Sequence, residues 1–149
     1  MEIKSKKSEF NHFSKLATEW WNKNGIFKIL HDIQLIRIKY IQDTLNKKKL
    51  NKLKILDLGC GGGLVSEGIA KLGADVTGID FIEENIRVAK KHAKQSKLEI
   101  NYIVKDFEKE RLTSKYDVII IFEVLEHLEN WKSFLEKIVI EASPSDMLG

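Results

Sequence analysis

A glycine-rich turn between two apolar segments constrains the fold of this chain more than any other feature. The segment Lys54-Ile55-Leu56-Asp57-Leu58 reads as a buried strand, and Gly59-Cys60-Gly61-Gly62-Gly63 follows it directly. A second apolar segment, Val76-Thr77-Gly78-Ile79-Asp80, ends in an acid. Glycines at a strand-to-helix turn let the backbone approach a ligand, and an acid ending the next strand can accept hydrogen bonds from a ribose diol. The pattern therefore predicts a nucleotide-like ligand.

The details of this turn choose among such ligands. A dinucleotide site requires G-x-G-x-x-G/A, whereas Leu64 occupies the sixth position here. The Gly-Lys-Ser/Thr sequence of a phosphate-binding P-loop is absent. The remaining candidate is S-adenosylmethionine (SAM), whose zwitterionic methionine end needs an acid and open backbone. The pattern Asp57-x-Gly59-x-Gly61-x-Gly63 resembles motif I of the class I SAM-dependent methyltransferases.

Strand and helix patterns alternate from residue 54 onward. We expect a helix over about 63–72, a strand over 75–79, and then a helix with Ile82, Ile86, Ala89 and Ala93 on one side. Two further strands are indicated by the alternation of Leu98, Ile100, Tyr102 and Val104 and by the β-branched run 118–122. A last helix from about Asn130 is expected to bury Trp131, Phe134, Leu135 and Ile138. This order predicts an α/β fold with an incomplete doubly wound parallel sheet of about four strands. The resemblance to motif I implies that the sheet is that of a Rossmann-like class I methyltransferase.

Two helices are expected before the sheet. The first begins at Ser8 and carries Trp20 and Trp21, and the second runs over about 29–45. Its apolar face is predicted to consist of Ile29, Ile33, Ile36, Tyr40 and Ile41. We therefore divide the chain into a helical segment, 1–53, that caps the cofactor site, and a partial SAM-binding methyltransferase domain, 54–149.

The net charge of +3 hides an asymmetry. The first 54 residues carry 13 Lys and Arg against 5 Asp and Glu, whereas the rest carry 12 against 17. This basic third can be a solvated helical face, or it can contact an anionic membrane surface or nucleic acid. Because Lys outnumbers Arg by 22 to 3, recognition of phosphates through Arg is disfavoured and no nucleic acid partner is expected. A nucleic-acid methyltransferase remains the weaker alternative.

Cysteine usage and hydropathy predict the compartment. The single Cys60 cannot form an internal disulfide, which favours a reducing environment. No apolar run approaches the roughly 18 residues that span a bilayer, and the N-terminus lacks a signal-peptide core. We expect a cytoplasmic protein, with peripheral contact at the inner face of the cell membrane as an option.

Candidate binding residues follow each predicted strand, because doubly wound sheets bind ligands at the carboxyl ends of their strands. Asp57 and the backbone of Gly59 and Gly61 would face the methionine end of SAM. Asp80 would accept both ribose hydroxyls. Asp106 would take the adenine amino group, with Phe81 or Phe107 against the ring.

A third group of polar residues follows the fourth strand. Glu123, Glu126 and His127 are spaced i, i+3 and i+4, so in a helix they share one face and could hold a divalent cation such as Mg²⁺. Alternatively, His127 is a general base, since an ordinary pKa of about 6.5 suits removal of a phenolic proton. A third interpretation leaves His127 shaping the site without chemistry.

Longer segments carry a more specific resemblance. The segments 13–21 (Phe-Ser-Lys-Leu-Ala-Thr-Glu-Trp-Trp), 25–31 (Gly-Ile-Phe-Lys-Ile-Leu-His) and 123–127 (Glu-Val-Leu-Glu-His), together with motif I, resemble the ubiquinone-biosynthesis O-methyltransferases. The resemblance implies methyl transfer from SAM to phenolic hydroxyls of polyprenylated precursors, of the 2-polyprenyl-6-hydroxyphenol and 3-demethylubiquinol type. It also implies SAM contacts at Arg37, Gly59, Asp80 and Phe122, and a Mg²⁺ site at Glu123, Glu126 and His127.

The chain departs from that family in two places. Gln34-Leu35-Ile36 stands where the family usually has Asn-Pro-Leu before the Arg. The family's sheet has seven strands, and this sequence supplies about four before Pro144. We therefore expect a C-terminally truncated copy with a bare edge at the fourth strand. The alternative function is a catalytically inactive SAM-binding fragment.

Overall fold

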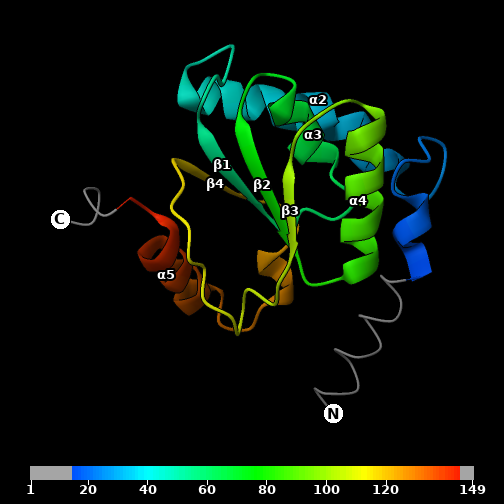
Figure 1. Ribbon diagram of the computed structural model, residues 1–149. Coiled ribbons are helices and arrows are strands. Elements are labelled where there is room, and N and C mark those ends of the chain that lie inside the picture. The colour runs from blue at the N-terminus through cyan, green and yellow to red at the C-terminus, as the bar shows by residue number, and fades with distance from the viewer. Residues whose placement is uncertain (1–14, 145–149) are drawn as a thin grey trace.

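The computed structural model describes residues 15–144 and contains one parallel sheet with the strand order β3-β2-β1-β4 (Figure 1). Every strand pair is parallel. The strands are β1 (Lys54–Leu58), β2 (Asp75–Asp80), β3 (Asn101–Val104) and β4 (Val118–Ile121). The helices are η1 (Ala17–Glu19), α2 (Lys28–Leu45), α3 (Leu64–Ala70), α4 (Glu83–Gln95), η2 (Leu125–His127) and α5 (Trp131–Ala142). The predicted α/β alternation and the four-stranded sheet are confirmed.

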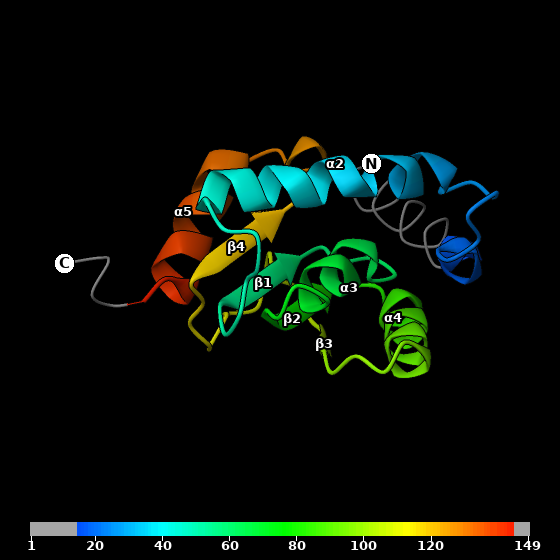
Figure 2. The ribbon, with the colours of Figure 1, turned by 90° about the horizontal axis from the view of Figure 1, so that it is seen from above.

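Both faces of the sheet are covered, which explains the apolar strand sequences. On one face, a cluster of buried side chains joins the sheet to α2 and α3: Ile55, Val76, Ile120, Ile41, Val65 and Ile69. On the other face, a second cluster joins it to α5: Leu56, Leu58, Ile79, Phe134 and Ile138. Figure 2 shows α5 on one side of the sheet and α3 and α4 on the other. Parallel strands covered on both faces read as continuous apolar runs, as seen in β1 and β4.

The third strand is shorter than its alternating sequence suggests. Strand β3 begins at Asn101, so Leu98 and Ile100 precede it, although both still pack against the cluster formed by α4 and Tyr102. Tyr102 is buried, whereas Val104 is 47% exposed. The alternating apolar residues that indicated this strand are therefore buried only in part.

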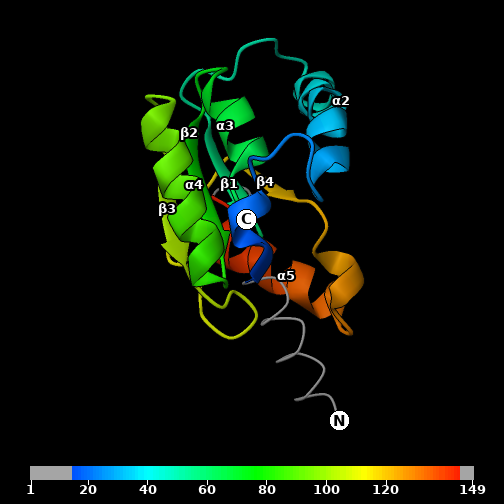
Figure 3. The same ribbon diagram turned by 90° about the vertical axis from the view of Figure 1, so that its right-hand side faces the viewer.

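The described chain before α2 lies between α4 and α2 (Figure 3). The predicted start of a helix at Ser8 lies outside the described residues. From residue 17 the chain forms the 3₁₀ turn η1 and then presents Trp20 and Trp21. Within residues 15–144, no helix combines the length and apolarity needed to cross a bilayer.

The buried side of α2 differs from the predicted one. Ile29, Ile36 and Tyr40 are 71%, 68% and 65% exposed, and of the predicted face only Ile41 is buried. Helix α2 instead turns toward α3 the side that carries Gln34 and Ile38, whose side chains lie close to Gly68, together with Ile41. The amide of Gln34 donates a hydrogen bond to Leu64 O over 2.6 Å, so a polar residue occupies part of this interface. Apolar periodicity alone did not identify it.

In α5 the predicted burial was wrong at Trp131 and only partly right at Leu135, which is half-buried. Phe134 and Ile138 are buried as expected, but Trp131 is 43% exposed at the first turn of the helix. The helix meets the sheet only from its second turn onward, so its first residue remains at the surface.

Candidate functional site

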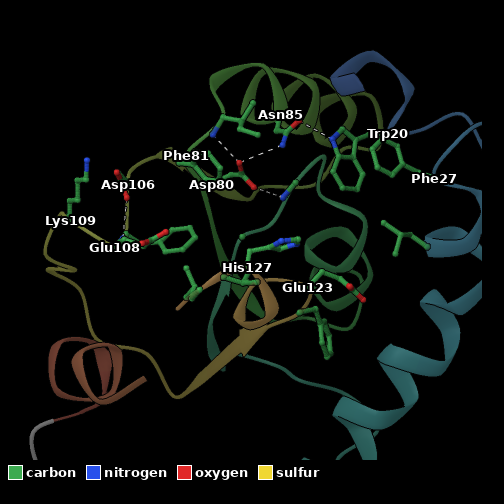
Figure 4. Close-up of a pocket in the computed structure, with 18 residues that line it drawn as sticks. Trp20, Phe27, Asp80, Phe81, Asn85, Asp106, Glu108, Lys109, Glu123 and His127 are labelled. Atoms are coloured by element: carbon green, nitrogen blue, oxygen red, sulfur yellow. Dashed lines mark hydrogen bonds between the residues drawn. The ribbon is translucent and has the colours of Figure 1, made fainter. Parts of the chain in front are cut away.

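A pocket of about 560 Å³ lies where the four strands end (Figure 4). Its wall includes most of the site residues predicted from the sequence, namely Gly59, Gly61, Asp80, Asp106, Phe122, Glu123 and His127. The described part of the predicted capping segment also contributes to the wall through Trp20, Phe27 and Leu30. A volume of this size is in the range of sites for small molecules and cofactors.

Asp80, at the end of β2, is the most strongly anchored polar group in this wall. Its Oδ2 accepts a hydrogen bond from Gly61 N over 2.9 Å, and its Oδ1 accepts one from Ile82 N over 2.9 Å. Asn85 Nδ2 lies 3.4 Å from the same Oδ1. The side chain is 5% exposed, and burial raises the pKa of Asp80 while these hydrogen bonds oppose the rise. A carboxylate fixed in this way is a ready acceptor for hydroxyl groups of a ligand.

The glycine turn is shaped by protein contacts as well as by access to the pocket. The amides of Gly59 and Cys60 both donate to Ile79 O, over 2.7 and 3.0 Å, which ties the turn to the end of β2. Gly61 has a left-handed φ of +55°, and a Cβ there would lie 2.6 Å from the ring of Trp20. Glycine is therefore required for the backbone conformation and for the close approach of the indole.

Asp106 and two aromatic rings line the part of the pocket beyond β3. Asp106 Oδ1 accepts a hydrogen bond from Glu108 N over 3.2 Å, and its backbone carbonyl accepts one from Lys109 N, as in a turn. Phe107 is buried, whereas Phe81 is 45% exposed. Both rings line the pocket, so the predicted choice between them for the adenine ring stays open.

Asp57 does not reach the pocket. It is 3% exposed, and Ser66 Oγ of α3 donates a hydrogen bond to its Oδ2 over 2.6 Å. Burial raises the pKa of Asp57 to about 6. In this structure Asp57 holds the turn against α3 from behind and is not among the residues that line the pocket, and its contact with the methionine end stays a prediction.

Arg37 also lies outside the pocket wall, but it contacts two residues that form it. Its guanidinium donates to Glu123 Oε1 and lies 5.0 Å from the centroid of the Phe122 ring. Its side chain is 16% exposed. The cation is thus held at the edge of the pocket by an acid and an aromatic ring.

The predicted trio of Glu123, Glu126 and His127 does not share a helical face. Only Leu125–His127 forms a turn of 3₁₀ helix, and Glu123 precedes it with a left-handed φ of +58°. Glu126 Oε1 lies 3.8 Å from His127 Nε2, while Glu123 is paired with Arg37. Across residues 15–144, no group of three or more His, Cys, Asp or Glu side chains is arranged to hold a metal ion. As placed here, these residues do not fit a Mg²⁺ site.

Sequence reasoning missed three residues that shape the pocket, Trp20, Phe27 and Asn85. The rings of Trp20 and Phe27 are stacked with centroids 4.0 Å apart. Trp20 and Phe27 were assigned only to the resemblance or to a helical face, and Asn85 sits on the helix that follows Asp80. Two features of the sequence could have identified them. Asn85 lies in the first turn of the helix that follows Asp80, and aromatic residues are frequent in the segment before α2.

Comparison with known families gives one match over most of the sheet. Residues 56–140 match a family model described as "Methyltransferase domain". Curated relatives include proteins named ubiquinone biosynthesis O-methyltransferase. The one from Pelagibacter ubique is 45% identical over 139 residues, 88% of this chain and 58% of the relative. The one from Rickettsia felis is 41% identical over 143 residues, 95% of this chain and 59% of the relative. The chain thus spans less than two thirds of the length of these relatives.

Solved structures with the same fold include methyltransferases crystallised with SAM or S-adenosylhomocysteine (SAH). Magnesium protoporphyrin IX methyltransferase from Synechocystis, with bound SAM, is 25% identical with a TM-score of 0.64, covering 74% of this chain and 53% of that one. A plantazolicin methyltransferase bound to SAH is 30% identical with a TM-score of 0.58, covering 96% of this chain and 59% of that one.

Proposed function

The chain belongs to the methyltransferase domain family, and on this premise we propose that it is a SAM-dependent O-methyltransferase acting on phenolic hydroxyls of polyprenylated ubiquinone precursors. The names of its curated relatives support the substrate class. In this proposal residues 1–53 cap the cofactor site, and residues 54–149 form a partial SAM-binding domain.

One observation carries the cofactor assignment: the anchored carboxylate of Asp80 in a pocket at the carboxyl ends of parallel strands. This is where doubly wound sheets bind nucleotide-like ligands. Asp80 would accept the ribose hydroxyls, and Asp106 with Phe81 or Phe107 would hold the adenine. The backbone of Gly59 and Gly61 would lie along the ligand, with Phe122 at its other side. Asp57 would support the turn and Arg37 would meet the ligand carboxylate.

His127 is the residue we assign to the acceptor. It lines the pocket on the turn that follows β4, and its side chain is 51% exposed. Bound SAM would supply a methyl group on a sulfonium sulfur. A phenol ionises with a pKa of about 10, so its oxygen becomes a good nucleophile at neutral pH only when a base takes the proton. His127 Nε2 or Nδ1 would take that proton while the pocket walls orient the ring.

The test is transfer of a labelled methyl group from SAM to a catechol-ring quinone precursor. The unmodified chain should release the methylated product, and His127→Ala should bind SAH with unchanged affinity but turn over at least tenfold more slowly. The assay is run with and without Mg²⁺, which tests the metal implied at Glu123, Glu126 and His127 by the resemblance. Absence of turnover in both conditions contradicts the proposed activity.

A second candidate is binding of SAM without turnover. It is favoured by the fact that the chain spans 58% and 59% of the length of the two relatives described above. Calorimetric binding of SAH without product formation would support this role. Recovery of turnover on adding the remaining part of a relative would then identify the chain as one portion of an enzyme.

We also propose that the basic N-terminal third contacts an anionic membrane surface, at the inner face of the cell membrane. It carries 13 Lys and Arg against 5 Asp and Glu, and α2 presents exposed Ile29, Leu35 and Ile36. Binding to anionic vesicles that weakens with salt, and no binding to zwitterionic vesicles, is the expected result. Equal sedimentation with both kinds of vesicle contradicts it.

A further inference from the structure

An indole, an amide and a carboxylate form a chain of contacts along one wall of the pocket (Figure 4). Trp20 Nε1 donates a hydrogen bond to Asn85 Oδ1 over 2.9 Å, and Asn85 Nδ2 lies 3.4 Å from Asp80 Oδ1. The direction is fixed by chemistry, because an indole can only donate and an ionised carboxylate can only accept. The amide of Asn85 must therefore turn its oxygen to Trp20 and its nitrogen to Asp80.

Burial makes this orientation depend on the indole. Asn85 is 3% exposed and Asp80 is 5% exposed, so water has little access to either group. If Trp20 no longer donated, the buried amide oxygen would lose its partner. Rotation of the amide toward another donor would withdraw its N–H from Asp80 Oδ1.

The indole is itself held in place on several sides. Its ring is stacked on Phe27 with an interplanar angle of 2°. The backbone of Gly61 and Gly62 lies against the same ring, where any Cβ would overlap it. His31 Nε2 lies 2.7 Å from Trp20 O, which fixes the backbone of the residue. The N–H is therefore aimed at Asn85 by packing across the glycine turn.

We infer that Trp20 is a positioning residue for the ribose-binding acid: through Asn85 it adds to the hydrogen bonds from Gly61 N and Ile82 N that hold the carboxylate of Asp80 in the orientation that accepts the ribose diol. This inference rests on the proposed binding of SAM. It assigns to the segment before α2 a specific role in cofactor affinity, beyond covering the pocket.

The test removes the donor and keeps an aromatic side chain. Calorimetry compares two variants with the unmodified chain. One is Trp20→Phe, and the other carries 3-benzothienylalanine at position 20, an isostere in which sulfur replaces the indole N–H. The ligands are SAH and an SAH analogue that lacks the ribose 2′- and 3′-hydroxyls. Both variants should bind SAH about three- to tenfold more weakly and bind the analogue as the unmodified chain does, since loss of one buried hydrogen bond has that effect. The isostere keeps the shape of the ring, so it preserves the test if Trp20→Phe does not fold.

Two further variants separate this role from general packing. Asn85→Ala should reduce the preference for SAH over the analogue to the same extent, and adding Trp20→Phe should reduce it no further. Trp131→Phe, at an exposed position of α5, should change neither affinity. Equal weakening of both ligands, or an unchanged affinity for SAH with the isostere, overturns the inference. If the unmodified chain does not bind SAH, the proposed function itself has failed.

Discussion

Trp21 and His92 are stacked face to face, with ring centroids 3.5 Å apart and an interplanar angle of 1°. Trp21 Nε1 also donates a hydrogen bond to Gly62 O over 2.8 Å. The imidazole of His92 makes a further contact, in which its Nδ1 donates a hydrogen bond to Glu67 Oε2 over 2.6 Å. This contact therefore links the segment before α2, the glycine turn, α3 and α4. The two neighbouring tryptophans therefore have different roles. Trp20 lines the pocket, whereas Trp21 binds the segment before α2 to the glycine turn and to α4.

Replacing His92 by Phe should destabilise the fold while keeping an aromatic ring against Trp21. Glu67 is 1% exposed, and its Oε1 has no hydrogen-bond partner among the described residues. Loss of the imidazole would leave the whole carboxylate buried without a partner, which costs about 1–3 kcal/mol. Urea unfolding followed by far-ultraviolet circular dichroism measures this free energy. The double variant His92→Phe/Glu67→Leu should recover most of the loss, and a double variant as unstable as the single one contradicts this explanation.

Gly62→Ala should displace Trp20. A Cβ at this position would overlap Trp20 Cγ and Cβ, and overpacking of this kind costs about 1–3 kcal/mol. We expect lower stability in urea and at least tenfold weaker binding of SAH. Gly68→Ala is the matched control, since its Cβ would meet only flexible side chains, Ile38 at 2.7 Å and the amide of Gln34 at 3.1 Å, and alanine favours the helix. Equal effects of the two substitutions would argue against a specific role for the Trp20 contact.

The sheet could be predicted from sequence because its determinants are local. The β-branched run of β4 and the acid that ends β2 are visible without tertiary information, and both lie where expected. The buried side of α2 could not be predicted in this way. Its contact with α3 uses Gln34 and Ile38, and the more apolar side with Ile29 and Ile36 stays exposed.

Within the site, the sequence predicted which residues lie at the strand ends better than it predicted where their side chains point. Asp80 lines the pocket as expected, whereas Asp57, in the same kind of sequence context, turns away toward Ser66. Strand alternation does not explain this difference, because Asp57 pairs with Gly78 and therefore lies on the same face of the sheet as Asp80. Asp57 lies inside β1 and accepts a hydrogen bond from Ser66 of α3, whereas Asp80 is the last residue of β2 and accepts one from Gly61 N. The sequence does not reveal which neighbour each acid will meet. The spacing of Glu123, Glu126 and His127 suggested one helical face, but the left-handed backbone at Glu123 turns that residue toward Arg37.

The pairing of Glu123 with Arg37 predicts competition with the ligand. If Arg37 binds the carboxylate of SAM, Glu123 must first release it. Glu123→Gln should then bind SAH a few-fold more tightly at low salt, and Arg37→Leu should bind it more weakly. Stability should change by less than about 1 kcal/mol in Glu123→Gln, since the Glu123 side chain is 57% exposed. Calorimetry at two salt concentrations measures the effect, and weaker binding by Glu123→Gln would mean that Glu123 itself contacts the ligand.

Asp57→Asn should change how stability depends on pH. Burial raises the pKa of Asp57 from 3.8 to about 6, so between these values the folded chain binds more protons than the unfolded chain. The stability contributed by this group is therefore lost as the pH rises through that window, and the loss is on the order of 3 kcal/mol. Asparagine retains the ability to hydrogen bond to Ser66 but does not ionise.

The free energy of unfolding of Asp57→Asn, relative to the unmodified chain, should accordingly increase from about pH 4 to about pH 6 and then stay constant. Urea unfolding at intervals between pH 4 and pH 8 measures this difference. Taking the difference between the two chains cancels most of the contribution of Asp80, whose pKa is also raised by burial and which titrates in both. A difference that does not vary with pH would mean that Asp57 ionises in the folded chain as easily as in water. The hydrogen bond from Ser66 would then offset the cost of burial.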